Sequence, residues 1–165
     1  MSAHPVPEPT STYRLWRRAL RRPGGRRAFS AAVSLKAPYF RTITPTVREM
    51  EHGRAVVTAP KWWGVQNHIG TFHAIAACNL AEFAMGMVAE ATIPATHRWL
   101  PKAMSVRYLA KAETSLRATA TLDPVPDCTA IAEGQDVVAA VAICDTSGTE
   151  VVHADITIWV TPQKP

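Results

Sequence analysis

The sequence has few cysteines and lacks the short motifs of several common chemistries. Three cysteines occur among 165 residues, and they are scattered over the chain. An odd, unclustered set forms neither a disulfide framework nor a CxxC zinc site, so we expect a reducing, cytoplasmic environment. No GxGxxG, Walker, GxSxG or HExxH motif is present either. These absences weigh against zinc, nucleotide redox and serine-hydrolase chemistry, and we predict no bound metal.

Acidic residues are almost missing from the first 41 positions. This segment carries nine Lys and Arg residues and one acid, Glu8, whereas the remaining chain carries nine basic and twelve acidic residues. The net charge of +5 therefore comes from the N-terminus. A basic segment is typical of a solvated surface or of attachment to an anionic partner. We predict a helical extension packed on the domain, with a membrane-surface contact as the alternative and no nucleic-acid partner.

No secretory signal is visible, because the first ten residues hold no Lys or Arg and no apolar run follows them. Pro5, Pro7 and Pro9 argue against a helix that starts at residue 1, which leaves a transit peptide as the lesser alternative. The same prolines predict that residues 1–11 are mobile.

Two short helices are predicted in the extension, over residues 12–22 and 26–36. Each is followed by helix-breaking residues. The side chains expected to face inward are Tyr13, Trp16 and Leu20 in the first helix and Phe29 and Val33 in the second. We therefore divide the chain into a basic, partly helical N-terminal extension (1–37) and one further domain (38–165).

Residues 71–91 form the longest helical pattern and are apolar nearly all round. Such a helix is buried on most sides, although its length would also permit a membrane span. His73, Asn79, Glu82 and Glu90 argue against a span, because one carboxylate at mid-bilayer costs about 2.5–3.5 kcal/mol. We predict a core helix whose many alanines let other backbone segments approach closely.

Alternating apolar and polar residues predict strands before and after this helix. Pro45 places the first strand at a sheet edge, and the nearly continuous apolar run of 135–144 predicts a strand covered on both faces. The predicted strands are 42–49, 54–59, 103–109, 115–122, 135–144 and 151–160. One long helix with many meandering strands indicates an α+β fold, in which a curled antiparallel sheet wraps around the helix.

The segment from Asn67 to His73 leads into the core helix and gathers polar groups there. Thr71 is the predicted N-cap, and Gly70 permits a tight turn. The first amides of a helix have no intrahelical partner and lie at the positive end of its dipole. They would therefore stabilise a carbonyl oxygen that gains negative charge. Glu82 supplies a carboxylate on the same helix.

Glu82 cannot join His73 in one compact site on one chain. A separation of nine residues places the two side chains on opposite faces of the helix, about 13 Å apart along its axis. If both act in one site, Glu82 of one chain must approach the helix start of another chain. The spacing therefore predicts a dimer with two shared sites.

The motif Asn67-x-x-Gly70-x-x-His73, followed by Glu82, resembles that of hotdog-fold thioesterases of the phenylacetate-pathway (PaaI-like) type. Residues 102–112 are similar to the strand after the central helix in an uncharacterised thioesterase-like (YiiD C-terminal-like) branch. The resemblance covers about residues 38–162. It implies a hotdog fold and a homodimer or dimer of dimers. It also implies an acyl group on coenzyme A or a carrier protein as substrate, with no cofactor beyond that coenzyme A.

The resemblance also implies residue roles. The predicted catalytic residues are Glu82, Asn67 and His73, and the predicted substrate-binding residues are Gly70, Ala74 and Lys102. The Ala74 N–H would polarise the thioester carbonyl, and Glu82 of the partner chain would activate water or attack directly. Asn67 would orient the water or the carbonyl, and His73 would position the thioester or support the helix start.

The sequence departs from the family pattern at the helix start, where His73-Ala74-Ile75 replaces His-Gly-Gly. Ala74 keeps its N–H but adds a methyl group, and Ile75 adds bulk beside the acyl tunnel. Pro101 stands where some members carry a hydroxyl. We favour an acyl-thioester hydrolase. The alternative is a non-catalytic module that binds acyl-CoA or a fatty acyl ligand, or that scaffolds a partner.

Overall fold

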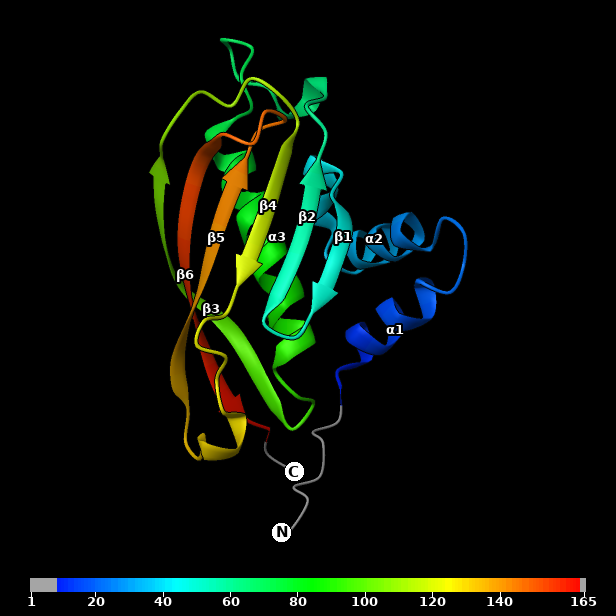
Figure 1. Cartoon of the computed structure of the whole chain (residues 1–165), viewed down its shortest axis with the longest axis vertical. Helices are drawn as coiled ribbons and strands as arrows, with labels where there is room; N and C mark the ends of the chain where they lie inside the picture. The colour runs from blue at the N-terminus through cyan, green and yellow to red at the C-terminus, as the bar shows by residue number, and fades with distance from the viewer. Residues whose placement is uncertain (1–8, 164–165) are drawn as a thin grey trace.

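The computed structural model describes residues 9–163, which form a six-stranded antiparallel sheet curled around a long helix (Figure 1). The strand order is β1-β2-β4-β5-β6-β3. The elements are α1 (Ser11–Ala19), α2 (Gly25–Lys36), η1 (Pro38–Ile43), β1 (Thr46–Glu51), β2 (Arg54–Ala59), η2 (Trp63–Val65), α3 (Ala74–Thr92), β3 (His97–Tyr108), β4 (Leu116–Thr121), η3 (Cys128–Ala130), β5 (Gln135–Cys144) and β6 (Glu150–Pro162). The predicted α+β architecture is confirmed. Residues 1–8 of the stretch predicted to be mobile lie outside the described residues.

The helix α3 is the centre of the core. It is long and apolar enough to cross a membrane, yet 61% of its apolar window is buried inside this chain. The fully buried alanines Ala81 and Ala84, together with Ala77, let β2 and β4 lie close against it. This helix is therefore the core helix that the sequence predicts.

Two strand predictions are corrected by the structure. Residues 42–45 are not a strand, because η1 covers the first two and Thr44 adopts a left-handed conformation with φ of 44°. The strand starts at Thr46 and lies at the sheet edge, where the sequence predicts it. The strand β5 is buried on one face only, and Val138 on its other face is 52% exposed. Alanines on that outer face made the run look apolar on both sides.

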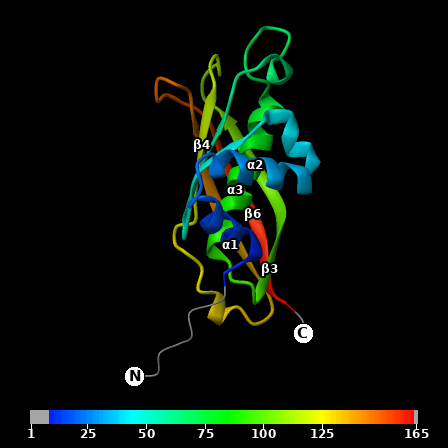
Figure 2. The ribbon, with the colours of Figure 1, turned by 90° about the vertical axis from the view of Figure 1, so that its right-hand side faces the viewer.

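The N-terminal extension packs against β1 and α3 and shares their core (Figure 2). Trp16 of α1 and Phe29 of α2 are buried, and their ring centroids are 5.1 Å apart. The Ser30 hydroxyl accepts a hydrogen bond from the Val47 N–H of β1 at 2.9 Å. The helix α1 ends earlier than predicted, so Leu20 is 44% exposed instead of facing inward.

We predict that Phe29→Ala destabilises the whole domain. Loss of the ring leaves a cavity between α1 and α2, and buried Phe→Ala changes cost about 3–5 kcal/mol. Urea denaturation would show a lower free energy of unfolding in one transition. Leu35→Ala on the same helix is the control, because Leu35 is 67% exposed; we expect a change within about 0.5 kcal/mol. A separate early transition of the extension would contradict the shared core.

Candidate functional site

One asparagine holds the loop before α3. The Asn67 Oδ1 accepts hydrogen bonds from the N–H groups of Ile69 and Thr71, each at 3.1 Å. Its Nδ2 donates to the Thr71 hydroxyl at 2.8 Å. The Asn67 N–H donates to the Thr71 carbonyl at 3.0 Å, and the Gly70 N–H donates to the Asn67 carbonyl at 3.0 Å. The side chain is thus committed to the shape of the loop, a common use of asparagine in turns.

Gly70 turns this loop toward the core. Its φ of 77° lies in the left-handed region, and a Cβ added there would meet nothing within 4 Å. Backbone conformation, not close packing, therefore favours glycine at this position. Phe72 then enters the core at 3% exposure.

His73, and not the predicted Thr71, caps α3. The Thr71 hydroxyl is taken by Asn67, and the helix starts at Ala74. The His73 Nδ1 accepts a hydrogen bond from the Ile75 N–H at 3.1 Å. A neutral ring that accepts at Nδ1 carries its proton on Nε2, so the other ring nitrogen of this exposed residue is a donor. The polar helix start is present, but its cap lies two residues later than predicted.

The first turn of α3 keeps two amides without a partner. The His73 ring takes the Ile75 N–H, whereas the N–H groups of Ala74 and Ala76 have no acceptor among residues 9–163. These amides lie at the positive end of a 19-residue helix. An oxyanion or a polarised carbonyl oxygen is the group that such a helix start favours.

A thiol–phenol pair, which the sequence did not reveal, lies one turn into α3. The Cys78 Sγ is 3.3 Å from the Tyr108 hydroxyl at the end of β3. This hydrogen bond, followed by burial and the negative charge of the Cys78 thiolate form, raises the pKa of Tyr108 to about 12, so the phenol stays protonated at neutral pH. Cys78 follows Ala74 by four residues on the same helix face. The alternating pattern of residues 103–109 indicated on which face of the strand Tyr108 lies, but no local pattern linked Tyr108 to Cys78.

Glu82 forms part of the wall of a cavity of about 430 Å³ beside α3. Its side chain is half-buried, and it has no hydrogen-bond or ion-pair partner within the described part of the chain. The other walls come from α1, α2, η1 and β3. None of residues 67–76 lines this cavity, so Glu82 and His73 do not share a site on one chain.

Lys102 lies on the other face of the sheet. Its ammonium donates to both carboxylate oxygens of Asp136, at 2.8 and 2.9 Å, and lies 5.0 Å from the centroid of the Trp159 ring. Trp159 faces outward on β6 between two fully buried neighbours. The pairing of β3 with β6 shifts register between Pro101 and Ala103. The structure therefore does not bring Lys102 to the helix start.

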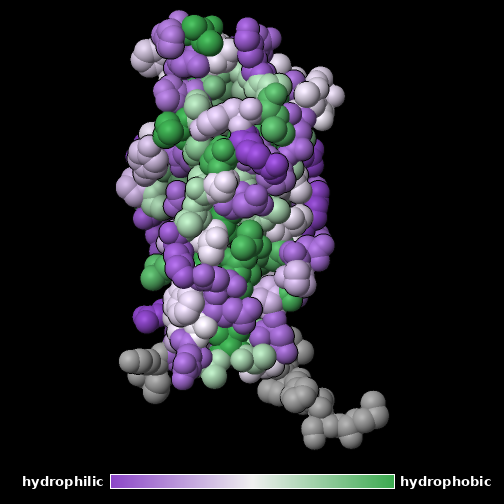
Figure 3. Space-filling view, turned by 90° about the vertical axis from the view of Figure 1, so that its left-hand side faces the viewer, coloured by the Kyte–Doolittle hydropathy of each residue, from purple (hydrophilic) through white to green (hydrophobic). Residues whose placement is uncertain are grey.

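The strand β3 leaves one sheet edge unpaired within the chain over twelve residues. It begins at His97 rather than at residue 103, so the strand is longer than predicted. Leu100, Met104 and Tyr108 are 61%, 37% and 54% exposed along it, and Figure 3 shows apolar side chains gathered along the middle of this side of the molecule. A long, apolar, exposed edge is a template for another strand.

The described residues build no metal centre. No group of three or more His, Cys, Asp and Glu side chains among them is arranged to hold a metal ion.

Known proteins share this fold. Residues 25–160 match the model of a family described as a domain of unknown function, DUF4442, whereas no curated protein matches the chain. A structural-genomics crystal structure, APC5556, is 38% identical and has a TM-score of 0.78, with 93% of this chain and 100% of that chain covered.

Two more distant structures share the fold. A Pseudomonas aeruginosa protein of unknown function, PA5026, described as a probable thioesterase, is 18% identical with a TM-score of 0.76 and coverage of 96% of this chain and 100% of its own. The thioesterase HI1161 from Haemophilus influenzae is 12% identical, with a TM-score of 0.66 and coverage of 75% and 82%. The chain therefore belongs to the DUF4442 family, and its fold is that of the hotdog-fold thioesterases.

Proposed function

We propose that this protein hydrolyses acyl thioesters, carried on coenzyme A or a carrier protein, in an active site shared by two copies of the chain. The proposal rests on the positions of two kinds of polar group along α3. Free amides lie at its start, and the unpaired carboxylate of Glu82 lies about 12 Å further along the axis. The description of the H. influenzae neighbour as a thioesterase supports the same class of reaction here.

The proposed reaction uses both groups at one carbonyl. The Ala74 N–H donates a hydrogen bond to the thioester oxygen, and Glu82 of the other copy takes a proton from water as that water attacks the carbonyl carbon. The tetrahedral oxyanion then collapses, the C–S bond breaks, and the leaving thiolate takes up the proton. An amide donor binds the oxyanion more strongly than the neutral carbonyl, which lowers the barrier.

A second copy would complete the site through the free edge of β3. Two β3 strands related by a twofold axis would pair antiparallel and continue the sheet. The same axis would set the two α3 helices in opposite directions, so that the start of one approaches the middle of the other. The exposed side chains of Leu100 and Met104 would then be covered.

The remaining residues at the helix start would support these two groups. Asn67 and Gly70 would act as positioning residues, because their contacts and conformation set the loop that leads into the helix. His73 would hold the first turn through Nδ1 and present its Nε2–H to the substrate.

A non-catalytic acyl-CoA-binding module is the second candidate. Ile75 is 56% exposed at the helix start, where the resembled motif has glycine, and its bulk narrows the approach to the Ala74 N–H. Incubation of the purified protein with acetyl-, hexanoyl-, decanoyl- and palmitoyl-CoA and a thiol reagent separates the two functions. Saturable binding without release of thiol would select the module.

We predict that Glu82→Gln lowers kcat/KM for acyl-CoA hydrolysis by about 10²–10⁴-fold, the usual contribution of a general acid–base group. Glutamine keeps the shape of the side chain but cannot take the proton from water. Thiol release measures the rate, and thermal unfolding checks that the fold persists. Glu133→Gln, at an exposed position before β5, should leave the rate unchanged. Equal turnover by Glu82→Gln and the natural chain would refute the role of Glu82.

We predict that two inactive variants complement each other. Ala74→Pro removes the N–H in question, and proline suits the first helical position after the extended backbone of His73. Each of Ala74→Pro and Glu82→Gln alone should be inactive. A mixed dimer has one site with an intact amide and an intact carboxylate, so about a quarter of the natural rate should return after subunit exchange. The shared site would be contradicted if sedimentation velocity showed that the active natural chain is a monomer. It would also be contradicted if the mixed dimers regained no hydrolytic activity.

We also propose that the N-terminal extension rests on an anionic membrane surface. Leu15, Leu20 and Leu35 are 46%, 44% and 67% exposed, and they lie among arginines on α1 and α2 and in the turn between them. Apolar side chains among cationic ones are typical of helices that lie in the membrane interface.

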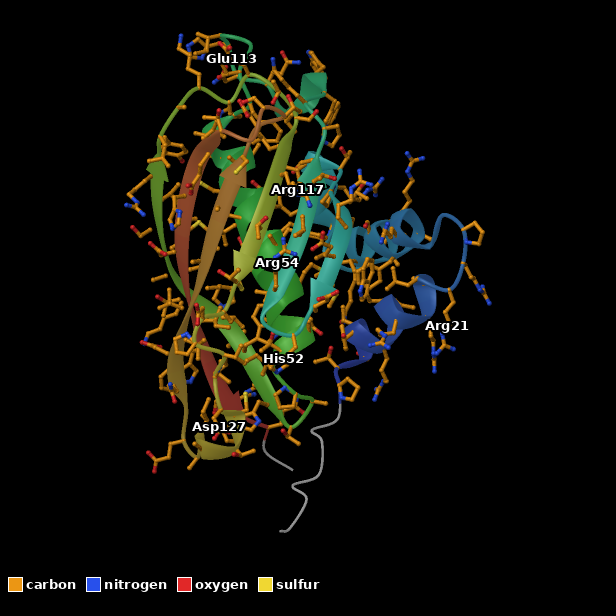
Figure 4. The ribbon with its side chains drawn as sticks, viewed as in Figure 1. Arg21, His52, Arg54, Glu113, Arg117 and Asp127 are labelled. Carbon is orange, nitrogen blue, oxygen red and sulfur yellow. The ribbon has the colours of Figure 1, made fainter. Side chains whose placement is uncertain are left out.

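The arginines of the extension are free for such a contact. Residues 9–41 contain no acid, and no arginine of α1 or α2 has an ion pair within the described residues. Arg21 points away from the sheet, whereas Arg54 and Arg117 lie on the sheet (Figure 4) and both pair with Glu49. The unpaired charge is thus concentrated on the extension.

We predict that the full chain sediments with vesicles that contain phosphatidylserine, that it does not sediment with pure phosphatidylcholine, and that added salt releases it. Arg17→Glu combined with Arg21→Glu should abolish the binding. Lys61→Glu combined with Lys111→Glu changes the net charge equally on loops outside the extension and should retain it. Equal binding to neutral vesicles would rule out this contact.

A further inference from the structure

The cavity beside Glu82 is large enough to hold part of a ligand. Its volume of about 430 Å³ lies within the range of about 300–1,000 Å³ typical of ligand pockets. Most of its wall is apolar and comes from α3, β3, η1 and the N-terminal extension. The apolar lining includes Val33, Phe40, Phe83, Met87, Trp99 and Leu100. An apolar ligand suits such a lining.

The wall is shaped by specific contacts. Phe40 of η1 meets Phe83 of α3 edge-on, with ring centroids 4.9 Å apart. Gly86 also lines the cavity, and a Cβ added to it would be in ordinary contact with Trp99 Cη2, at 3.5 Å. The absence of a side chain at this position therefore leaves room for about one methyl group beside Trp99.

Charged residues mark the limits of the cavity along α3. Glu82 lies nearest to the start of the helix among the α3 residues that line it, and Glu90 lies furthest along. Lys36 of α2 lines the cavity as well, and it shares a second, more polar hollow with Glu90. The end of the cavity near Glu90 is therefore polar. An apolar ligand that extended past this end would leave the charged groups poorly solvated.

We infer that this cavity receives the acyl chain of the thioester and that the N-terminal extension sets the length of that chain. The inference rests on the proposed function, because it starts from a carbonyl held beside Glu82. Glu82 and Glu90 are eight residues apart in α3, or about 12 Å along the axis. An extended backbone spans about 3.3–3.6 Å per three bonds, so roughly ten bonds fit between the two carboxylates. The site favours medium-chain acyl groups near decanoyl.

The extension can set this length because it is rigidly anchored. The half-buried Val33 of α2 lines the cavity, and the same helix is held by the buried Phe29 and by the Ser30–Val47 hydrogen bond. A larger side chain at position 33 therefore takes up acyl space instead of displacing the helix.

Chain-length profiles of Val33→Phe and Ala32→Phe test the inference. The natural chain should hydrolyse decanoyl-CoA better than acetyl- or palmitoyl-CoA. Val33→Phe should lower kcat/KM for decanoyl-CoA by about tenfold or more, since one methylene in an apolar pocket already changes it about 10–200-fold. The rate with hexanoyl-CoA should change less than about twofold. Ala32→Phe adds the same ring at an exposed position of α2 and should alter neither rate.

Gly86→Ala is a second variant that should fold, because alanine is favoured over glycine inside a helix and the contact with Trp99 is an ordinary one. It should shift the preference toward shorter chains by a smaller factor than Val33→Phe. An unchanged chain-length profile in both variants would overturn the acyl-chain assignment even if hydrolysis is observed.

Calorimetry with decanoyl-CoA separates this inference from the proposed function. If no acyl-CoA is hydrolysed, the proposed function fails, but tenfold weaker binding by Val33→Phe than by Ala32→Phe still supports the cavity as the acyl site. Equal binding by the two variants, or no binding by the natural chain, overturns it.

Discussion

The sheet of one chain wraps the central helix only partly, and the packing of the other elements follows from this. The helix α3 is apolar nearly all round, yet a single six-stranded sheet covers only part of it. Burial of apolar surface contributes about 25 cal/mol per Å², so the bare side of such a helix has to be closed by something else. Ala74, Cys78 and Glu82 are the exposed or half-buried residues along that side. The groups suited to chemistry therefore lie in the gap that the sheet leaves open.

Two further elements close this gap from different directions. The N-terminal extension covers the later part of α3, anchored by Trp16 and Phe29. The unpaired edge of β3 offers a second copy of the chain a place beside the first part. The extension shapes the apolar cavity, and in the proposed dimer the partner copy would bring its helix start to the carboxylate. Basic charge on the outer surface of the extension would orient the part of the cavity wall that the extension forms toward a membrane.

In the proposed reaction, the helix start would act through its backbone more than through its side chains. The resembled motif has glycine where this chain has Ala74, but an alanine keeps the N–H that a carbonyl oxygen needs. Asn67 and Gly70 are occupied with the loop, and His73 caps the helix through Nδ1. The motif thus holds the loop and the first helical turn so that the unpaired amides point in a defined direction. This explains how two glycines can be replaced while the geometry of the helix start is kept.

Local patterns in the sequence determined the core helix, most of the strands and the polar loop ahead of α3, because periodicity and turn chemistry act between near neighbours. Contacts between residues far apart in the chain fix the remaining features. The Thr71 hydroxyl went to Asn67, which left His73 as the cap. Lys102 reached Asp136, 34 residues away, and Tyr108 reached Cys78, 30 residues away. The cavity joins the extension to α3 and β3. No local pattern encodes such contacts, because they depend on which strands become neighbours when the sheet curls around the helix.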